Sequence, residues 1–411
     1  MDTRVILILS AEAVLSFFLI CRAARAKKFR HVLCIVLLTL AAFTSRYFAL
    51  DYVTLDYKDF LSRWVDYFRN NGGFSALSQS VGNYNIPYLY FLAAFSYSDI
   101  NDLYLIKLLS IFFDVLLAYG SAVIIGRFID SKVRIIACYF TILMLPTVYL
   151  NGSLWGQCDS TYAALAILGI YCALDDRPIL SMVLAALSFG FKLQAVFILP
   201  VYAVLWFNGK FKIWHFAVFP AAYVLLVLPA VLFGRPFLET ITLYFNQTGS
   251  IGDGLNYNSP SVYSMFQYSL PEKYNSIASA LGITAAAVYM ICVLLICYVN
   301  RNRLTEKSVL GAALLFAIGI PFLLPHMHDR YFFAADVLSV LIAFAAFEFS
   351  ALPILVQFAS LLGYHAYLKG RYLLLMDRGA WALIAALILT IWFFISTLRH
   401  NNDSRRAALH N

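Results

Sequence analysis

LYLIKLLSIFFDVLLAYGSAVII, residues 103–125, is the stretch that decides the fold of this chain, and its only charged residues are Lys107 and Asp114. About 20 consecutive apolar residues are enough for a helix to cross a bilayer. Similar runs recur along the whole length, and the chain is 62% hydrophobic and only 13% charged. Soluble domains are about half apolar and about a quarter charged. The sequence therefore predicts an all-α polytopic membrane protein.

Apolar segments at helical length predict about thirteen spans. They cover residues 5–22, 31–50, 103–125, 135–150, 160–174, 178–191, 193–207, 213–233, 276–299, 308–324, 331–347, 352–368 and 380–398. The first is expected to be a retained helix, because a basic run and no small-residue cleavage pattern follows it. The two segments around Lys192 are short for full crossings. We see no internal repeat and predict a single membrane domain over residues 1–411.

The positions of lysine and arginine predict the orientation of the spans. Placing the basic loop 22–31 in the cytoplasm and alternating along the chain concentrates basic residues on the cytoplasmic side. Two long segments, 51–102 and 234–275, then form outer loops. Residues 84–98 in the first are apolar but short and rich in tyrosine, which suits the membrane interface. Residues 60–68 have the spacing of an amphipathic helix.

Composition and motifs exclude several classes of protein. The net charge of +8 follows from the topology and does not indicate nucleic-acid binding. The chain has no glycine-rich phosphate-binding motif and no HExxH motif, so neither a nucleotide site nor a zinc site is indicated. Its seven cysteines are scattered without paired spacing, which argues against a disulfide framework. We therefore expect no cofactor and no metal, with membrane lipid as one partner.

Four polar clusters interrupt the apolar chain, and the predicted topology places all four on the outer face. They are residues 56–60, 155–159, 191–194 and 326–330. Acids, bases and amides that converge on one face of a helical membrane protein suggest a buried reaction site that is supplied from the bilayer.

Asp56 opens the first outer loop. A carboxylate at the membrane surface can act as a general base that removes a proton from an acceptor hydroxyl. The alternative is a solvated interfacial aspartate, which is the commoner state of a lone acid in such a loop. Asp51 and Asp59 compete with Asp56 for the catalytic role.

The cluster 155–159 lies in a short outer loop. Gln157 and Asp159 are candidates for holding sugar hydroxyls, with the Trp155 ring stacked on a sugar face. The alternative is a tight turn with an interfacial tryptophan, in which Asp159 or Ser160 caps the following helix. The two interpretations are compatible.

Lys192 interrupts an apolar stretch that would otherwise be continuous. A lysine inside the bilayer costs about 2.5–3.5 kcal/mol on insertion scales, so such residues usually face a cavity or a partner. A phosphate group is a natural partner for an ammonium. The alternative is a lysine that extends toward the interface from the end of a short span. Gln194 belongs to the same candidate site.

The cluster 326–330 follows Pro325 at the outer end of a predicted span. Arg330 and the imidazoles of His326 and His328 are candidates for binding a phosphate and stabilising it as a leaving group, with Asp329 beside them. A polar loop that caps the next helix is the weaker interpretation. Metal binding by the two histidines has no further ligand cluster to support it.

Five motifs together resemble the bacterial PIG-V-like membrane proteins, which are related to GPI mannosyltransferases and belong to the GT-C glycosyltransferase superfamily. The motifs are Asp56-Tyr57-x-x-Phe60-x-x-x-Trp64, Asn83-Tyr84-Asn85-x-Pro87-Tyr88, Asn151-Gly152-Ser153-Leu154-Trp155-Gly156-Gln157-x-Asp159, Phe191-Lys192-x-Gln194 and His326-x-His328-Asp329-Arg330-Tyr331-Phe332. The last also resembles dolichyl-phosphate-glucose-dependent glucosyltransferases. The resemblance implies a GT-C-like helical bundle whose first outer loop carries the catalytic acid, and Asp56 matches that acid.

The resemblance also implies a reaction. A hexose, either mannose or glucose, would pass from a polyprenyl phosphate to a cell-surface glycan or glycolipid on the extracytoplasmic face of the cell membrane, with inversion and without a metal. Two other functions stay open. A transporter or flippase for lipid-linked sugars should have polar residues spread through the midplane and often inverted repeats. A glycan polymerase or ligase that uses a lipid-linked oligosaccharide would share the topology.

Overall fold

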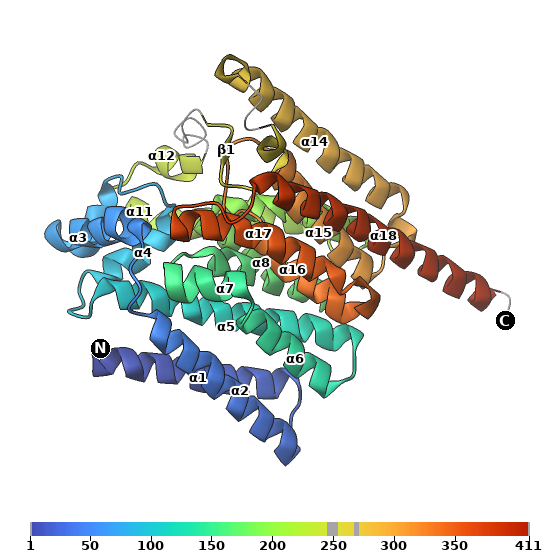
Figure 1. Cartoon of the computed structure of the whole chain (residues 1–411), viewed down its shortest axis with the longest axis horizontal. Coiled ribbons are helices and arrows are strands. Elements are labelled where there is room, and N and C mark those ends of the chain that lie inside the picture. Colours follow the sequence, from blue (N-terminus) through green and yellow to red (C-terminus); the bar gives the residue numbers. More distant parts are fainter. Residues whose placement is uncertain (1, 245–253, 267–270, 410–411) are drawn as a thin grey trace. The chain divides into compact units, whose positions relative to one another are not determined.

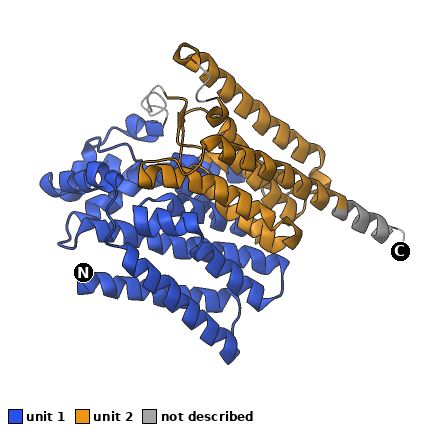
Figure 2. Ribbon diagram, in the orientation of Figure 1, with its two compact units in different colours: residues 1–172, 179–195, 214–250 blue, residues 173–178, 196–213, 251–411 orange. Residues whose placement is uncertain are grey.

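The protein is almost entirely helical, and a computed structural model describes residues 2–244, 254–266 and 271–409 (Figure 1). Eight of the described helices are long and apolar enough to cross a membrane, and a ninth crossing is formed if one bent helix pair is counted as a span. This confirms a multi-pass helical protein. The chain divides into two compact units, drawn in different colours in Figure 2. The prediction of a single functional domain stays a prediction.

Unit 1 comprises residues 1–172, 179–195 and 214–250. Its helical elements are α1 (Thr3–Ala23), α2 (Phe29–Ala49), η1 (Tyr57–Leu61), α3 (Ser62–Asn70), η2 (Gly73–Ser78), α4 (Ile86–Phe95), α5 (Asp102–Phe128), α6 (Lys132–Leu143), α7 (Pro146–Tyr149), η3 (Leu150–Trp155), most of α8 (Asp159–Leu174), most of α9 (Pro178–Phe191), the start of η4 (Leu193–Phe197), most of η5 (Ile213–Ala217), α11 (Val218–Leu232) and α12 (Phe237–Ile241). Helix α5 is largely buried and packs against α1, α6 and η3. It is the central helix of the unit.

Unit 2 comprises residues 173–178, 196–213 and 251–411. Its elements are α10 (Val201–Phe207), β1 (Asn256–Tyr257), η6 (Val262–Met265), η7 (Glu272–Tyr274), α14 (Asn275–Val299), η8 (Arg301–Arg303), α15 (Glu306–Leu323), β2 (Met327–His328), α16 (Phe333–Ala345), η9 (Phe347–Phe349), α17 (Ala351–Lys369) and α18 (Met376–Leu409). The nearly fully buried α15 packs against α14, α16 and α18. The short strands β1 and β2 pair in parallel, with Tyr257 opposite His328.

The predicted count of about thirteen spans is not confirmed, because several predicted spans are shorter helices. Helices α8, α9 and α16 have 16, 14 and 13 residues. At 1.5 Å per residue they extend about 20–24 Å, which is less than the hydrocarbon core of about 30 Å. The predicted span 135–150 corresponds to α6 and the following helical segment, which are bent by 45° at a break before Pro146. Proline cannot donate the hydrogen bond that would continue the helix.

The predicted outer loop, residues 51–102, contains the helical elements η1, α3, η2 and α4. Helix α4 lies within the segment predicted to rest on the membrane interface, but Tyr88, Leu89 and Leu92 in it are buried. They form an apolar cluster with Val65 and Phe68 of α3. The loop is therefore a small helical layer that packs through this cluster against α5, α9 and α11. Of the second predicted loop, 234–275, residues 245–253 and 267–270 lie outside the described residues.

Candidate active site

Asp56 is held in unit 1 by two N–H donors that come from a segment about a hundred residues further along the chain. Its Oδ2 accepts a hydrogen bond of 2.8 Å from the indole Nε1 of Trp155 and one of 2.6 Å from Nε2 of Gln157. The Asp56 side chain is half-buried, whereas the neighbouring Asp59 is 52% exposed and paired with Arg63 at 3.5 Å. The two aspartates therefore differ in their partners: Asp56 accepts hydrogen bonds from two distant side chains, whereas Asp59 forms only an exposed local ion pair among the contacts described.

The segment that supplies these donors is shaped by a π-helical turn and a glycine. The turn η3 ends at Gly156, whose φ of 80° lies in the left-handed region that glycine adopts without strain. The backbone carbonyl of Asn151 accepts hydrogen bonds from the N–H groups of both Gly156 and Gln157, the latter at 2.9 Å. This closed turn directs Trp155 and Gln157 toward Asp56. Single π-helical turns occur frequently at functional sites.

A buried ion pair lies at the start of α8 in the same unit. Nζ of Lys192 is 2.6 Å from Oδ1 of Asp159, and Nδ2 of Asn151 donates to Oδ2 of Asp159 at 2.7 Å. Lys192 is 5% exposed and Asp159 is fully buried. Both carboxylate oxygens of Asp159 therefore have partners, which a buried charge requires. Lys192 follows the end of α9, so this pair connects two helices.

Tyr84 connects the ion pair to the carboxylate of Asp56. Its hydroxyl donates to Oε1 of Gln157 at 2.8 Å, and Nζ of Lys192 lies 6.0 Å from the centre of its ring. That separation is at the outer limit of a cation–π contact. Unit 1 therefore brings Asp56, Gln157, Lys192 and Asp159 into one continuous network. The sequence assigned no role to Tyr84, although this residue stands in one of the motifs that carry the resemblance.

Trp155 is placed differently from expectation, and Gln194 has a buried polar atom whose role stays a prediction. Trp155 is fully buried, so its ring is not an open platform for a sugar, and its N–H binds Asp56 instead. Gln194 is 8% exposed, and its side-chain oxygen has no hydrogen-bond partner within the described part of the chain. Sequence spacing could not find either placement, because both depend on which helix packs over the side chain.

His326 and its neighbours lie in unit 2, where β2 joins α15 to α16. The backbone of His326 has a φ of 61°, and its N–H donates to the carbonyl of Leu255 at 2.8 Å. Its Nδ1 is 2.7 Å from the carbonyl of Gly254, and its Nε2 is 3.2 Å from the hydroxyl of Ser279. A carbonyl only accepts, so Nδ1 carries a proton. A phosphate would have to replace one of these bonds to reach the ring.

The rest of this cluster is organised by stacking and by a charged pair. The His328 ring stacks on that of Tyr257, with centres 4.8 Å apart and planes at 14°. Arg330 and Asp329 pair at 3.5 Å, and their side chains are 15% and 5% exposed. The cluster is thus a compact, largely buried polar element. Binding of a phosphate by His326, His328 and Arg330 stays a prediction.

The comparison with known protein families bears on this geometry. The model of glycosyltransferase family 87 matches residues 83–325, which is more than half of the chain. The match contains Tyr84, the 150–160 segment and Lys192, and it begins after Asp56. A comparison with curated proteins finds no match. The chain therefore belongs to glycosyltransferase family 87, a GT-C-type family, and is a glycosyltransferase.

Proposed function

We propose that this protein transfers a hexose, mannose or glucose, from a polyprenyl-phosphate donor to a glycan or glycolipid acceptor on the extracytoplasmic face of the cell membrane. The observation that carries the proposal is the pair of N–H donors on Asp56, in a chain that belongs to a glycosyltransferase family. The PIG-V-like motifs support mannose as one of the two candidate sugars.

Asp56 is the proposed general base. It would take the proton of the acceptor hydroxyl as the hydroxyl oxygen attacks the anomeric carbon. The bond from that carbon to the phosphate oxygen breaks in the same step, and the polyprenyl phosphate leaves with the bonding electrons. A single displacement of this kind inverts the anomeric centre. Half-burial gives an acceptor access to the carboxylate, while Trp155 and Gln157 fix its direction.

Lys192 is the proposed ligand of the donor phosphate in unit 1. An ammonium has three N–H donors, and the hydrogen bond to Asp159 uses one of them. A phosphate can therefore bind Lys192 without breaking the ion pair. We propose that Gln157 and Asp159 act by holding Asp56 and Lys192 in place. His326, His328 and Arg330 keep their predicted role as phosphate ligands, with Asp329 orienting Arg330 and with Gln194 as an additional polar contact.

The test is transfer by the purified protein in liposomes. It would be offered radiolabelled polyprenyl-phosphate mannose, polyprenyl-phosphate glucose and nucleotide sugars, together with a glycolipid acceptor extract. We expect transfer from a polyprenyl-phosphate sugar only. Asp56→Asn should lower the rate by about 10²–10⁴-fold, the typical contribution of a general base.

The matched control is Asp59→Asn, three residues away on the same loop and exposed, which should keep the wild-type rate. Wild-type transfer by Asp56→Asn, or transfer from nucleotide sugars, would contradict the proposal. Net movement of lipid-linked sugar across the vesicle without a new glycosidic bond would indicate a flippase. A requirement for a lipid-linked oligosaccharide as donor would indicate a polymerase or ligase.

A further inference from the structure

We propose that a polar stripe on α5, formed by Lys107, Ser110 and Asp114, is a positioning element that sets the geometry of Asp56 and of the donors that hold it. The inference rests on the proposed function. The three residues follow each other at spacings of three and four, so they lie on one face of the helix. All three side chains are at most 1% exposed.

Lys107 holds the chain that leads to Asp56. Its Nζ donates to three backbone carbonyls, those of Ala49 at 3.0 Å, Leu50 at 2.9 Å and Tyr52 at 2.6 Å. Helix α2 ends at Ala49, and the last carbonyls of a helix have no intrahelical partner. A cation at a helix C-terminus also interacts favourably with the helix dipole. The lysine thus fixes the point from which the 51–61 segment leaves the helix.

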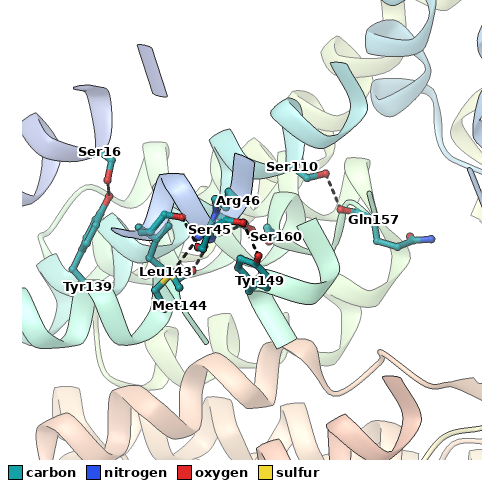
Figure 3. A network of polar contacts seen from close by, with 12 residues as sticks. Ser16, Ser45, Arg46, Ser110, Tyr139, Leu143, Met144, Tyr149, Gln157 and Ser160 are labelled. Atoms are coloured by element: carbon teal, nitrogen blue, oxygen red, sulfur yellow. Dashed lines mark hydrogen bonds and ion pairs between the residues drawn. The ribbon is translucent and has the colours of Figure 1, made fainter. Parts of the chain in front are cut away.

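Ser110 holds the segment that supplies the donors. Its hydroxyl donates to the backbone carbonyl of Gln157 at 2.8 Å. Figure 3 shows this contact, with the Gln157 amide extending away from Ser110. The hydroxyl therefore fixes the backbone of Gln157 while leaving its side chain for Asp56.

Asp114 holds the other end of the same segment. It accepts a short hydrogen bond from the hydroxyl of Ser160, and Nη2 of Arg46 lies 3.1 Å from its Oδ2. The same Arg46 nitrogen donates to the carbonyl of Leu143 at 2.6 Å (Figure 3). Gly152 packs so closely that a Cβ there would lie 2.8 Å from Oδ2 of Asp114. Buried charges inside an apolar unit cost several kcal/mol unless they are paired or hydrogen-bonded. Here Asp114 is paired with Arg46 and Lys107 donates to three carbonyls, so the placement of both on one helix face indicates a role.

The two segments held by the stripe are also joined directly. The hydroxyl of Thr54 donates to the carbonyl of Trp155 at 3.1 Å. Helix α5 therefore anchors both sides of the Asp56 contact, through backbone carbonyls at Lys107 and Ser110 and through the Ser160 hydroxyl at Asp114. None of the hydrogen bonds described above joins a stripe residue to Asp56 itself. Support of this kind from outside the reacting groups is what keeps a site within its productive geometry.

The test uses full-length protein and the transfer assay with a polyprenyl-phosphate sugar. Ser110→Ala should lower kcat by about 5- to 10-fold with a change in donor KM below about twofold, because a lost hydrogen bond of about 1 kcal/mol misdirects Gln157 without removing a ligand. The control is Ser121→Ala on the same helix. Ser121 is fully buried, and its hydroxyl has no partner among the described residues. This variant should keep kcat.

A double-mutant cycle separates positioning from general loosening of the fold. In a Gln157→Ala background, Ser110→Ala should lower kcat by less than about twofold, since the side chain that it positions is gone. An unchanged kcat in Ser110→Ala, or an equal fall in kcat in the wild-type and Gln157→Ala backgrounds, overturns the inference.

A second variant tests the lysine of the stripe. Lys107→Met should reduce kcat more strongly, by about tenfold or more. Should Lys107→Met fail to fold, the serine cycle still decides. If Ser110→Ala and Lys107→Met kept the wild-type kcat while Asp56→Asn was inactive, the positioning role of the stripe would be refuted and the proposed function would stand. An active Asp56→Asn would instead refute the proposed function.

Discussion

Two segments of unit 1 meet at Asp56, and they differ sharply in exposure. Residues 51–61 carry the acid and are mostly exposed, with Thr54 and Leu61 as the buried exceptions. Residues 150–160 carry the donors and are almost entirely buried. Each contains a π-helical turn. The acid therefore lies where a substrate can reach it, while the groups that orient it lie in a packed interior. Rigid support for an accessible reacting group is the arrangement that catalysis requires.

The largest effect is expected from removing the buried ion pair between Lys192 and Asp159, at the end of the buried segment. Lys192→Met leaves Asp159 buried without its cation and should lower the free energy of unfolding by about 3–5 kcal/mol. The matched change on the exposed side is Arg63→Met, which removes the exposed partner of Asp59 and should cost less than about 1 kcal/mol. Thermal unfolding in detergent measures both. Equal stabilities of the two variants would show that the buried pair is not structurally important.

A smaller effect is expected from removing the hydrogen bond between Trp155 and Asp56, which joins the two segments. Trp155→Phe removes the N–H that binds Asp56 and keeps most of the buried ring. A hydrogen bond to a charged group contributes about 1.5–3 kcal/mol, so kcat should fall by about 10- to 100-fold. The control is Trp381→Phe, an exposed tryptophan on α18, which should leave kcat unchanged. If Trp155→Phe kept the wild-type kcat at unchanged stability, Asp56 would not depend on this donor.

The smallest effect is expected from Tyr57, whose hydroxyl anchors the exposed segment to Asp102. Burial, together with the nearby Asp102 carboxylate, raises the pKa of Tyr57 from 10.0 to about 12. Its hydroxyl donates to Asp102 at 3.1 Å, and this requires the neutral phenol. The unfolded chain ionises at lower pH than the folded one, so this stabilisation is complete below pH 10 and is lost as the pH rises toward 12.

Thermal unfolding from pH 9 to 11.5 measures this dependence in the wild-type protein and in Tyr57→Phe. The variant, which has no phenol to titrate at this position, should show a shallower decline of stability with pH than the wild type. Identical slopes would mean that Tyr57 does not couple the segment to folding in this pH range.

The sequence predicted where many of the helices lie, but not which of them are long enough to cross a membrane. Spans such as 103–125 and 276–299 correspond to α5 and α14, because an uninterrupted apolar run has few alternatives to a helix in a membrane. The segments 160–174 and 331–347 are similarly apolar but correspond to α8 and α16, which have only 16 and 13 residues. Apolarity alone does not distinguish a lipid-facing crossing from a helix that is buried against other helices.

The candidate site shows the same division. Gln157, Asp159 and Lys192 could be named from the sequence, since each is polar beside apolar segments, whereas Asp56 was distinguished from Asp51 and Asp59 only by the family resemblance. Their partners could not be named, because hydrogen bonds that join residues 56 and 157, or 159 and 192, depend on helix packing. The buried position of Trp155 is the clearest example, since a tryptophan at a loop looks the same in sequence whether it faces a sugar or a carboxylate.

The sequence by itself determined that the chain is helical and apolar, and which polar residues interrupt it, because the cost of an unpaired polar group in lipid leaves a readable pattern. Only the tertiary structure decided that Asp56 is held by Trp155 and Gln157, that Lys192 pairs with Asp159, and that one face of α5 supports both segments. These contacts join residues far apart in the chain. Packing selects them, and no local pattern of residue types records which helix faces meet.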